Sequence, residues 1–166
     1  MKLAKPAIAV RIHAVPATAL KEMTIMSEAE NAALVRRWFD EVWNERRDAT
    51  VHELLHPEAV GHLEGLVSHG VNDFLSARAF ILRAFPDFHI VVEETAAQGD
   101  NVVVRWSANG SHGGDFLGVA ATGAPVSFRG ITWMRLSAGR LLEGWDVWNQ
   151  GRVLDELRAQ AGHPPG

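Results

Sequence analysis

The feature that most constrains the fold is a succession of four strand-like stretches in the second half of the chain. Turn-forming residues separate these stretches, which cover about residues 87–98, 101–112, 125–136 and 140–150. Two of the turns, at Gly99-Asp100 and Ala138-Gly139, are short enough to favour antiparallel hairpins. The sequence therefore predicts a long antiparallel meander, whose apolar face needs a second layer to cover it.

Helices expected before the strands can supply that layer. The first covers about residues 28–46, where a capping box of Ser27 and Glu30 satisfies two free backbone N–H groups. Its apolar side chains recur at helical spacing and are Leu34, Val35, Trp38, Phe39, Val42 and Trp43. Asp48 is expected to cap a short second helix, and a third helix is expected over about residues 71–85.

Helices followed by an antiparallel meander are typical of the α+β class. A long curved antiparallel sheet is expected to wrap around the N-terminal helices as a cone-shaped α+β barrel with an internal cavity. The chain of 166 residues is long enough for one such domain, which we expect over residues 26–166. Residues 1–25 show no periodic apolar face and are expected to be a poorly ordered extension, with a short added strand over residues 7–15 as the alternative.

Composition excludes several classes of function. The chain has no Cys, which rules out disulfides, zinc–thiolate sites and cysteine nucleophiles. A net charge of −4 without a cluster of Lys and Arg argues against nucleic acid as the main partner. No apolar run approaches the roughly 20 residues of a membrane span. We therefore expect no nucleic-acid or membrane partner and a cytoplasmic location.

One acid lies among apolar residues in the last predicted strand, within residues 139–151. Because side chains alternate along a strand, Asp146 is expected to share a face with Leu142, Gly144 and Trp148. An acid on a buried face costs free energy unless it is paired or has a chemical role. The pattern alone leaves open whether Asp146 is a functional group or a structural acid that is hydrogen-bonded to a turn.

A second pair of polar side chains lies on a predicted short strand and turn over residues 56–65. His62 and Glu64 are two residues apart and would face the same way, a spacing that could suit a metal ion. No third ligand is evident nearby, so we expect no metal site.

Most of the chain resembles a known family, the SnoaL-like polyketide cyclases, which belong to the nuclear-transport-factor-2-like superfamily of cystatin-like α+β barrels. The resemblance covers about residues 28–161 and implies the same fold. The segments that carry it are NAALVRRWFDEVWNERRDATVHELLHPEAVGH, RAFPDFHIVVEE, GDNVVVRWSANGSHGGDFLGVAATGAPVSFRGI and GRLLEGWDVWNQGRVLDEL.

The resemblance also implies a chemistry and its residues. In these cyclases an aspartate on the last long strand is the general acid/base of an intramolecular aldol ring closure, without metal or cofactor, and it matches Asp146 without a gap. A family histidine on the preceding strand is matched by Thr132, and a family asparagine on the first strand by Gly61, next to His62. The histidine before the Gly-rich loop is retained as His112.

An aldol closure needs a base for an acidic C–H and hydrogen-bond donors for the enolate oxygen. Desolvation by apolar neighbours is expected to raise the pKa of Asp146 toward working pH. The donor candidates are His112, His62, Thr132 and the indole N–H of Trp148. Each has a structural alternative, since His112 could cap a strand end and Trp148 could be pocket wall.

Aromatic side chains are expected to line the pocket. Trp38 and Trp43 are core residues or pocket walls, and Phe116 is assigned to the substrate pocket. Phe116 belongs to a Gly-rich loop over residues 113–124 that is expected to fold over the pocket mouth.

We therefore predict a polyketide-cyclase-like enzyme that acts without a cofactor on an apolar, carbonyl-containing small molecule. Epoxide hydrolysis or isomerisation in the same pocket is an alternative. Epoxide hydrolases of this superfamily hold water with an Asp–Arg–Asp set, whereas Arg105 and Arg135 are expected to point outward. A non-catalytic dimeric binding protein with the same cavity is a further alternative.

The other face of the predicted sheet indicates a homodimer. By alternation, Trp133, Arg135, Trp145 and Val147 point away from the cavity and form an apolar patch. Sheet-to-sheet dimers are also common in the family that the chain resembles. The rival prediction is that a terminal segment covers the patch.

Overall fold

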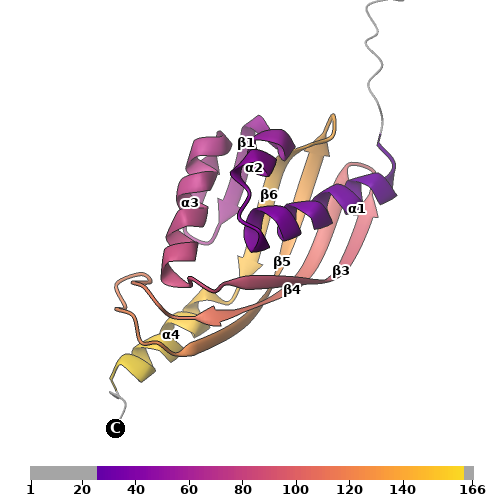
Figure 1. The fold of residues 1–166 in the computed structure, drawn as a ribbon. Coiled ribbons are helices and arrows are strands. Elements are labelled where there is room, and N and C mark those ends of the chain that lie inside the picture. Colours follow the sequence, from indigo (N-terminus) through magenta and orange to yellow (C-terminus); the bar gives the residue numbers. More distant parts are fainter. Residues whose placement is uncertain (1–25, 163–166) are drawn as a thin grey trace, which may run out of the picture.

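A computed structural model describes residues 26–162 (Figure 1). Helices lie against a curved six-stranded sheet, with the strand order β2-β1-β6-β5-β4-β3. This architecture confirms the predicted α+β class. The predicted extension over residues 1–25 lies outside the described part of the chain.

The four long predicted strands form the meander. They are β3 (His89–Gln98), β4 (Asn101–Ser111), β5 (Pro125–Ser137) and β6 (Arg140–Trp148). Each pairs with the next in antiparallel orientation. The turn between β5 and β6 has positive φ angles of 48° at Ala138 and 74° at Gly139, as tight hairpin turns require.

Two further strands extend the sheet beyond β6. They are β1 (Leu55–Leu63), which the sequence predicted in part, and β2 (Leu66–His69), which it did not predict. β1 pairs with β2 as a hairpin but runs parallel to β6, so the sheet is mixed rather than wholly antiparallel. Parallel pairing is possible here because a long stretch of chain connects β1 to β6.

The helices are α1 (Glu28–Arg37), a π-helical segment η2 (Trp38–Asn44), α2 (Asp48–Leu54), α3 (Gly70–Ala84) and α4 (Gln150–Ala161). The capping box is confirmed: the Ser27 hydroxyl accepts from the Glu30 N–H, and the Glu30 carboxylate accepts from the Ser27 N–H. The prediction that Asp48 caps α2 is wrong. Asp48 is the first helical residue, and its carboxylate accepts a hydrogen bond from Arg78.

The π-helical segment explains why two tryptophans face the sheet together. Its hydrogen bonds join residues five apart, such as the bond of 2.9 Å from the Glu45 N–H to the Asp40 carbonyl. Trp38 and Trp43 are also five apart, so they lie nearly one above the other. In the continuous α-helix predicted over residues 28–46, they would point about 140° apart.

Two groups of helices pack against the two ends of the sheet's concave face. α1 and η2 pack on β3 at one end of the sheet, and α3 packs on β1 and β2 at the other end (Figure 1). The concave face of β6 therefore lies between the two groups of helices, and the functional site is found there. None of the helices within residues 26–162 is long and apolar enough to cross a membrane.

Candidate active site

Asp146 lies on the concave face of β6, as predicted, but with one different neighbour. Gly144 and Leu141 line the same cavity as Asp146, whereas Leu142 was expected there. Leu142 is the extra residue of a β-bulge opposite residues 135–136. A bulge reverses the alternation of side chains beyond it, which explains the difference.

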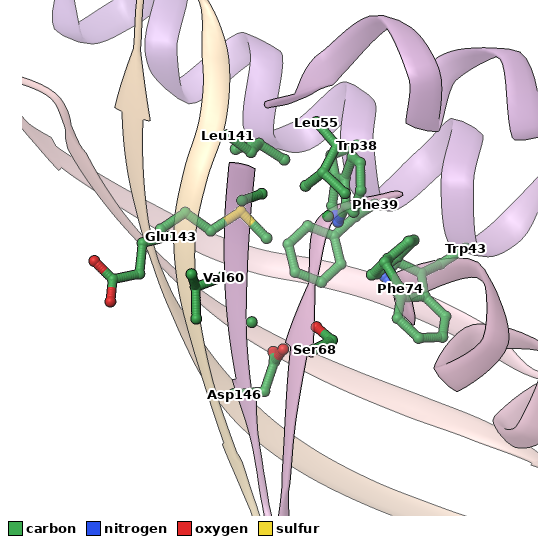
Figure 2. Close-up of a pocket in the computed structure, with 15 residues that line it drawn as sticks. Trp38, Phe39, Trp43, Leu55, Val60, Ser68, Phe74, Leu141, Glu143 and Asp146 are labelled. Carbon is green, nitrogen blue, oxygen red and sulfur yellow. The ribbon is translucent and has the colours of Figure 1, made fainter. Parts of the chain in front are cut away.

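The cavity has two compartments that share Phe39, Trp43 and Asp146. We call one the serine compartment (Figure 2); its further lining includes Trp38, Gly61, Ser68, Phe74, Met134 and Gly144. The other is the aromatic compartment, whose further lining includes Ile81, Phe85, Phe88, Trp106, Phe128 and Trp148. Each compartment has an internal free volume of about 60 Å³, and both are open to solvent.

A hydrogen-bond chain across three strands holds the Asp146 carboxylate. The Thr132 hydroxyl, on β5, donates to Asp146 Oδ1. The same hydroxyl accepts from the Trp106 indole N–H, on β4, over 2.9 Å. Because the indole can only donate, it directs the single hydroxyl proton of Thr132 toward Asp146. Oδ1 is therefore engaged, and Oδ2 is the carboxylate oxygen left for a ligand.

A glycine on β5 makes this chain possible. Gly130 pairs with Trp106 across the strands, and a Cβ at Gly130 would lie 2.2 Å from the Trp106 ring. Only a residue without a side chain lets the indole cross β5 and reach Thr132. Sequence reasoning missed both Trp106 and Gly130. A glycine inside a strand was the available signal, because such glycines often mark a close approach.

The surroundings of Asp146 tune its acidity. Burial raises the pKa of the Asp146 carboxyl to about 6, because the charged form loses water, and the Thr132 hydrogen bond opposes this rise. A carboxylate with this pKa is ionised at neutral pH and is a stronger base than an exposed aspartate. The arrangement can therefore remove and return a proton inside an apolar cavity.

Three of the predicted tryptophans line the cavity. Trp38 lines the serine compartment, Trp43 lines both compartments, and Trp148 lines the aromatic compartment. Trp148 stacks on Phe128 with 4.7 Å between ring centroids. Their contact with a ligand stays a prediction.

His112 and Phe116 lie outside the cavity wall. His112 is fully buried against Phe85, its Nδ1 accepts from the Thr122 N–H over 3.3 Å, and burial lowers its pKa. Phe116 is also fully buried and packs on Phe85, with 5.1 Å between ring centroids. Because Phe85 itself lines the aromatic compartment, these two side chains form a layer behind it. The geometry does not support His112 as a donor to a ligand in the cavity.

The Gly-rich loop does not fold over the cavity. The N–H groups of Gly113 and Gly114 donate to the Ala84 carbonyl at the end of α3, over 2.9 Å and 3.1 Å. A Cβ at Gly114 would lie 2.2 Å from the Arg83 carbonyl oxygen, so glycine is needed for this docking. None of residues 113–124 lines either compartment.

His62 lies on the opposite, convex face of the sheet, and this corrects its assignment as a pocket donor. Its ring stacks on Trp145 with 5.2 Å between centroids, and Nε2 lies 2.9 Å from a Glu143 carboxylate oxygen. Its hydrogen-bond partner is thus Glu143 rather than the nearby Glu64. Within residues 26–162, no group of three His, Asp or Glu side chains is arranged to hold a metal ion.

The sequence reasoning also missed Ser68, on the strand β2 that it did not predict. Ser68 is 5% exposed and lines the serine compartment together with Asp146. Besides Asp146, the side chains of the serine compartment with a proton to donate are Ser68 and the indoles of Trp38 and Trp43.

Comparisons with known proteins agree with this fold. A model of the SnoaL-like polyketide cyclases matches residues 33–157. A structure from a Jannaschia species, assigned as a SnoaL-like polyketide cyclase, is 27% identical, with a TM-score of 0.73 over 83% of this chain and 95% of that one. AclR from Streptomyces galilaeus, assigned as a hydroxylase, is 29% identical, with a TM-score of 0.71 over 80% of this chain and 83% of that one.

IdmH from Streptomyces antibioticus, assigned as a polyketide cyclase, is 27% identical, with a TM-score of 0.67 over 80% of this chain and 98% of that one. A comparison with curated protein sequences gave no match. The family model covers well over half of the chain, and the neighbouring structures share its curved sheet and helices. The chain therefore belongs to the SnoaL-like polyketide cyclase family.

Proposed function

We propose that this protein is a polyketide-cyclase-like enzyme that closes a ring by intramolecular aldol-type chemistry, without a cofactor. The observation that carries this proposal is the Asp146 carboxylate, which faces an apolar cavity with its pKa raised to about 6. Such a group can both accept and return a proton near neutral pH.

The reaction needs one group, Asp146, that first acts as a base and then, once protonated, acts as an acid. Asp146 Oδ2 removes a proton from a carbon between two carbonyl groups, and the C–H electron pair moves to give an enolate. The enolate carbon then attacks a second carbonyl carbon of the same molecule, which forms the new C–C bond. The oxygen of that second carbonyl takes the proton back from Asp146, so the carboxylate is regenerated and no electrons leave the substrate.

The walls of the cavity indicate the class of substrate. Aromatic and aliphatic side chains from η2, α3 and the sheet surround Asp146 and keep water away from the enolate. A flat, largely apolar molecule with several carbonyl groups suits such a surface. Ring closure also benefits from the folded conformation that a narrow apolar cavity imposes on the substrate.

The alternative of epoxide hydrolysis with an Asp–Arg–Asp set has less support. No arginine within residues 26–162 lines either compartment. Arg105 pairs with Glu93 and Glu94, and Arg135 pairs with Glu143 on the convex face. A non-catalytic binding protein would use the same cavity and is distinguished by the experiment below.

The test is Asp146→Asn, which keeps the shape of the side chain but removes proton transfer. With a panel of linear polyketide-like β-keto esters, we expect ring formation to fall by about 10²–10⁴-fold, measured by chromatography of the cyclic product. Asp155→Asn is the control, because Asp155 lies on the exposed face of α4, where its side chain is 80% exposed. Unchanged ring formation by Asp146→Asn would overturn the proposal, and binding without turnover by the wild type would favour the binding protein.

A further inference from the structure

The Ser68 side chain lines the cavity, and its hydroxyl has no hydrogen-bond partner among the described residues. Ser68 is only 5% exposed, and its side chain lines the serine compartment. No residue within 26–162 forms a hydrogen bond with this hydroxyl. Ser68 Oγ is not among the fully buried, unpartnered side-chain atoms of residues 26–162, so it is accessible from the cavity. The hydroxyl is therefore placed to bind a group that enters the cavity.

Two glycines clear the space between Ser68 and Asp146. Gly61, on β1, pairs with Ser68 on one side and with Gly144 on the other, so these three residues form a row across β2, β1 and β6. Asp146 lies two residues beyond Gly144 on the same face. In Figure 2, the oxygen atoms of Ser68 and Asp146 border the same space, whereas the Glu143 carboxylate points away from it.

The position of the Ser68 hydroxyl depends directly on Gly61. A Cβ at Gly61 would lie 2.5 Å from Ser68 Oγ, so the hydroxyl occupies the volume that any other residue would fill with its side chain. β2 and β6 are two strand spacings apart, roughly 10 Å between backbones. This gap can hold a dicarbonyl unit with its acidic carbon at Asp146 and one of its oxygens at Ser68.

We propose that Ser68 donates the hydrogen bond that stabilises the enolate oxygen formed when Asp146 removes the substrate proton. This proposal rests on the proposed function. Ser68 suits the role better than the other donor candidates, because the Thr132 proton is already committed to Asp146. His62 lies on the convex face, and His112 lies behind Phe85. The rivals in the serine compartment are the indole N–H groups of Trp38 and Trp43.

The experiment measures the donor separately from the base. Asp146→Asn is used as the host protein, because its neutral side chain imitates the protonated Asp146 that accompanies an enolate. The probe is 4-nitrophenol at pH 8, where it is largely a phenolate whose oxygen imitates the enolate oxygen. Its affinity is measured by absorbance titration, and so is the pKa of the bound phenol.

In the Asp146→Asn host, adding Ser68→Ala is expected to weaken phenolate binding about tenfold or more, since a hydrogen bond to a charged oxygen is lost. The pKa of the bound phenol should rise at the same time. Ser127→Ala is the control, because Ser127 is an exposed serine on β5, three strands away from Ser68 in the sheet. Trp43→Phe keeps an aromatic side chain but removes the indole N–H, and it should cost less than threefold in affinity.

Gly61→Ala provides an independent variant that leaves the hydroxyl in the protein. Its methyl group should displace Ser68 Oγ and weaken phenolate binding as Ser68→Ala does, and the two changes together should add nothing further. Unchanged phenolate affinity in Ser68→Ala, or a loss in Trp43→Phe instead, would overturn the role of Ser68.

The host itself tests the proposed function separately. Removing the like charge of Asp146 should make phenolate binding at pH 8 tighter than in the wild type. If the wild type and Asp146→Asn bind phenolate equally, the proposed function fails. If they differ while Ser68→Ala has no effect, only the inference about Ser68 fails.

Discussion

At the scale of single residues, Asp146 is a destabilising group that the rest of the fold offsets. Its pKa is about 6 in the folded protein, against an ordinary value of 3.8. Below about pH 4, Asp146 is protonated in both the folded and the unfolded protein, so its raised pKa does not change the free energy of unfolding. Its ionisation lowers the free energy of unfolding as pH rises toward 6, and above pH 6 the cost is constant, at most about 3 kcal/mol.

We therefore expect Asp146→Asn to melt at a higher temperature than the wild type at pH 8 and at nearly the same temperature at pH 4. The amide oxygen can still accept the Thr132 hydrogen bond, so only the buried charge is removed. Thermal unfolding of both proteins at the two pH values provides the measurement. A variant less stable than the wild type at pH 8 would identify Asp146 as a structural acid.

At the scale of elements, strands β4, β5 and β6 act together through the chain Trp106–Thr132–Asp146. The Thr132 hydrogen bond lowers the pKa of Asp146, so its loss should raise that pKa further. Thr132→Val should thus move the acid limb of the pH–rate profile to higher pH. Gly130→Ala should move it the same way, because the added methyl group displaces Trp106.

The acid limb of kcat/KM against pH, or a carbon NMR titration of the Asp146 carboxyl, measures this shift. Gly151→Ala is the matched control, since a Cβ at Gly151 meets no atom within 4 Å. Gly130→Ala is also expected to destabilise the protein by about 1–3 kcal/mol through overpacking, whereas Gly151→Ala is not. An unchanged titration of Asp146 in Thr132→Val would contradict the role of the chain.

At the scale of the whole molecule, the convex face of the sheet exposes an apolar patch. Ile131, Trp133 and Val147 are 49%, 50% and 63% exposed, and they lie on the adjacent strands β5 and β6. Patches of this kind mark interaction sites. We propose that a second copy of the chain covers this patch, so that the protein is a homodimer joined through its sheets.

In a symmetric dimer, a charge introduced at the patch meets its own copy. We expect Val147→Lys to convert the dimer to a monomer, measured as molar mass by light scattering at micromolar concentration. Leu117→Lys is the control, because Leu117 is an equally apolar, 45% exposed residue in the Gly-rich loop over residues 113–124. A wild-type protein that is monomeric under these conditions would contradict the prediction.

Local patterns in the sequence predicted the meander, the helices before it and the position of Asp146 on the concave face. Turn residues and the alternation of side chains act over a few neighbouring residues, so they can be read without knowing the partner strands. The same patterns correctly placed Trp133 and Val147 on the convex face. They failed at Leu142, where a bulge interrupts the alternation.

The tertiary structure decided which side chains surround Asp146. The parallel pairing of β1 with β6 brings Gly61 and Ser68 to the cavity and turns His62 to the convex face. Trp106 reaches Thr132 only because Gly130 leaves room across the strand. Strand neighbours and register depend on how the whole sheet buries its apolar face, and no short segment of sequence contains that information.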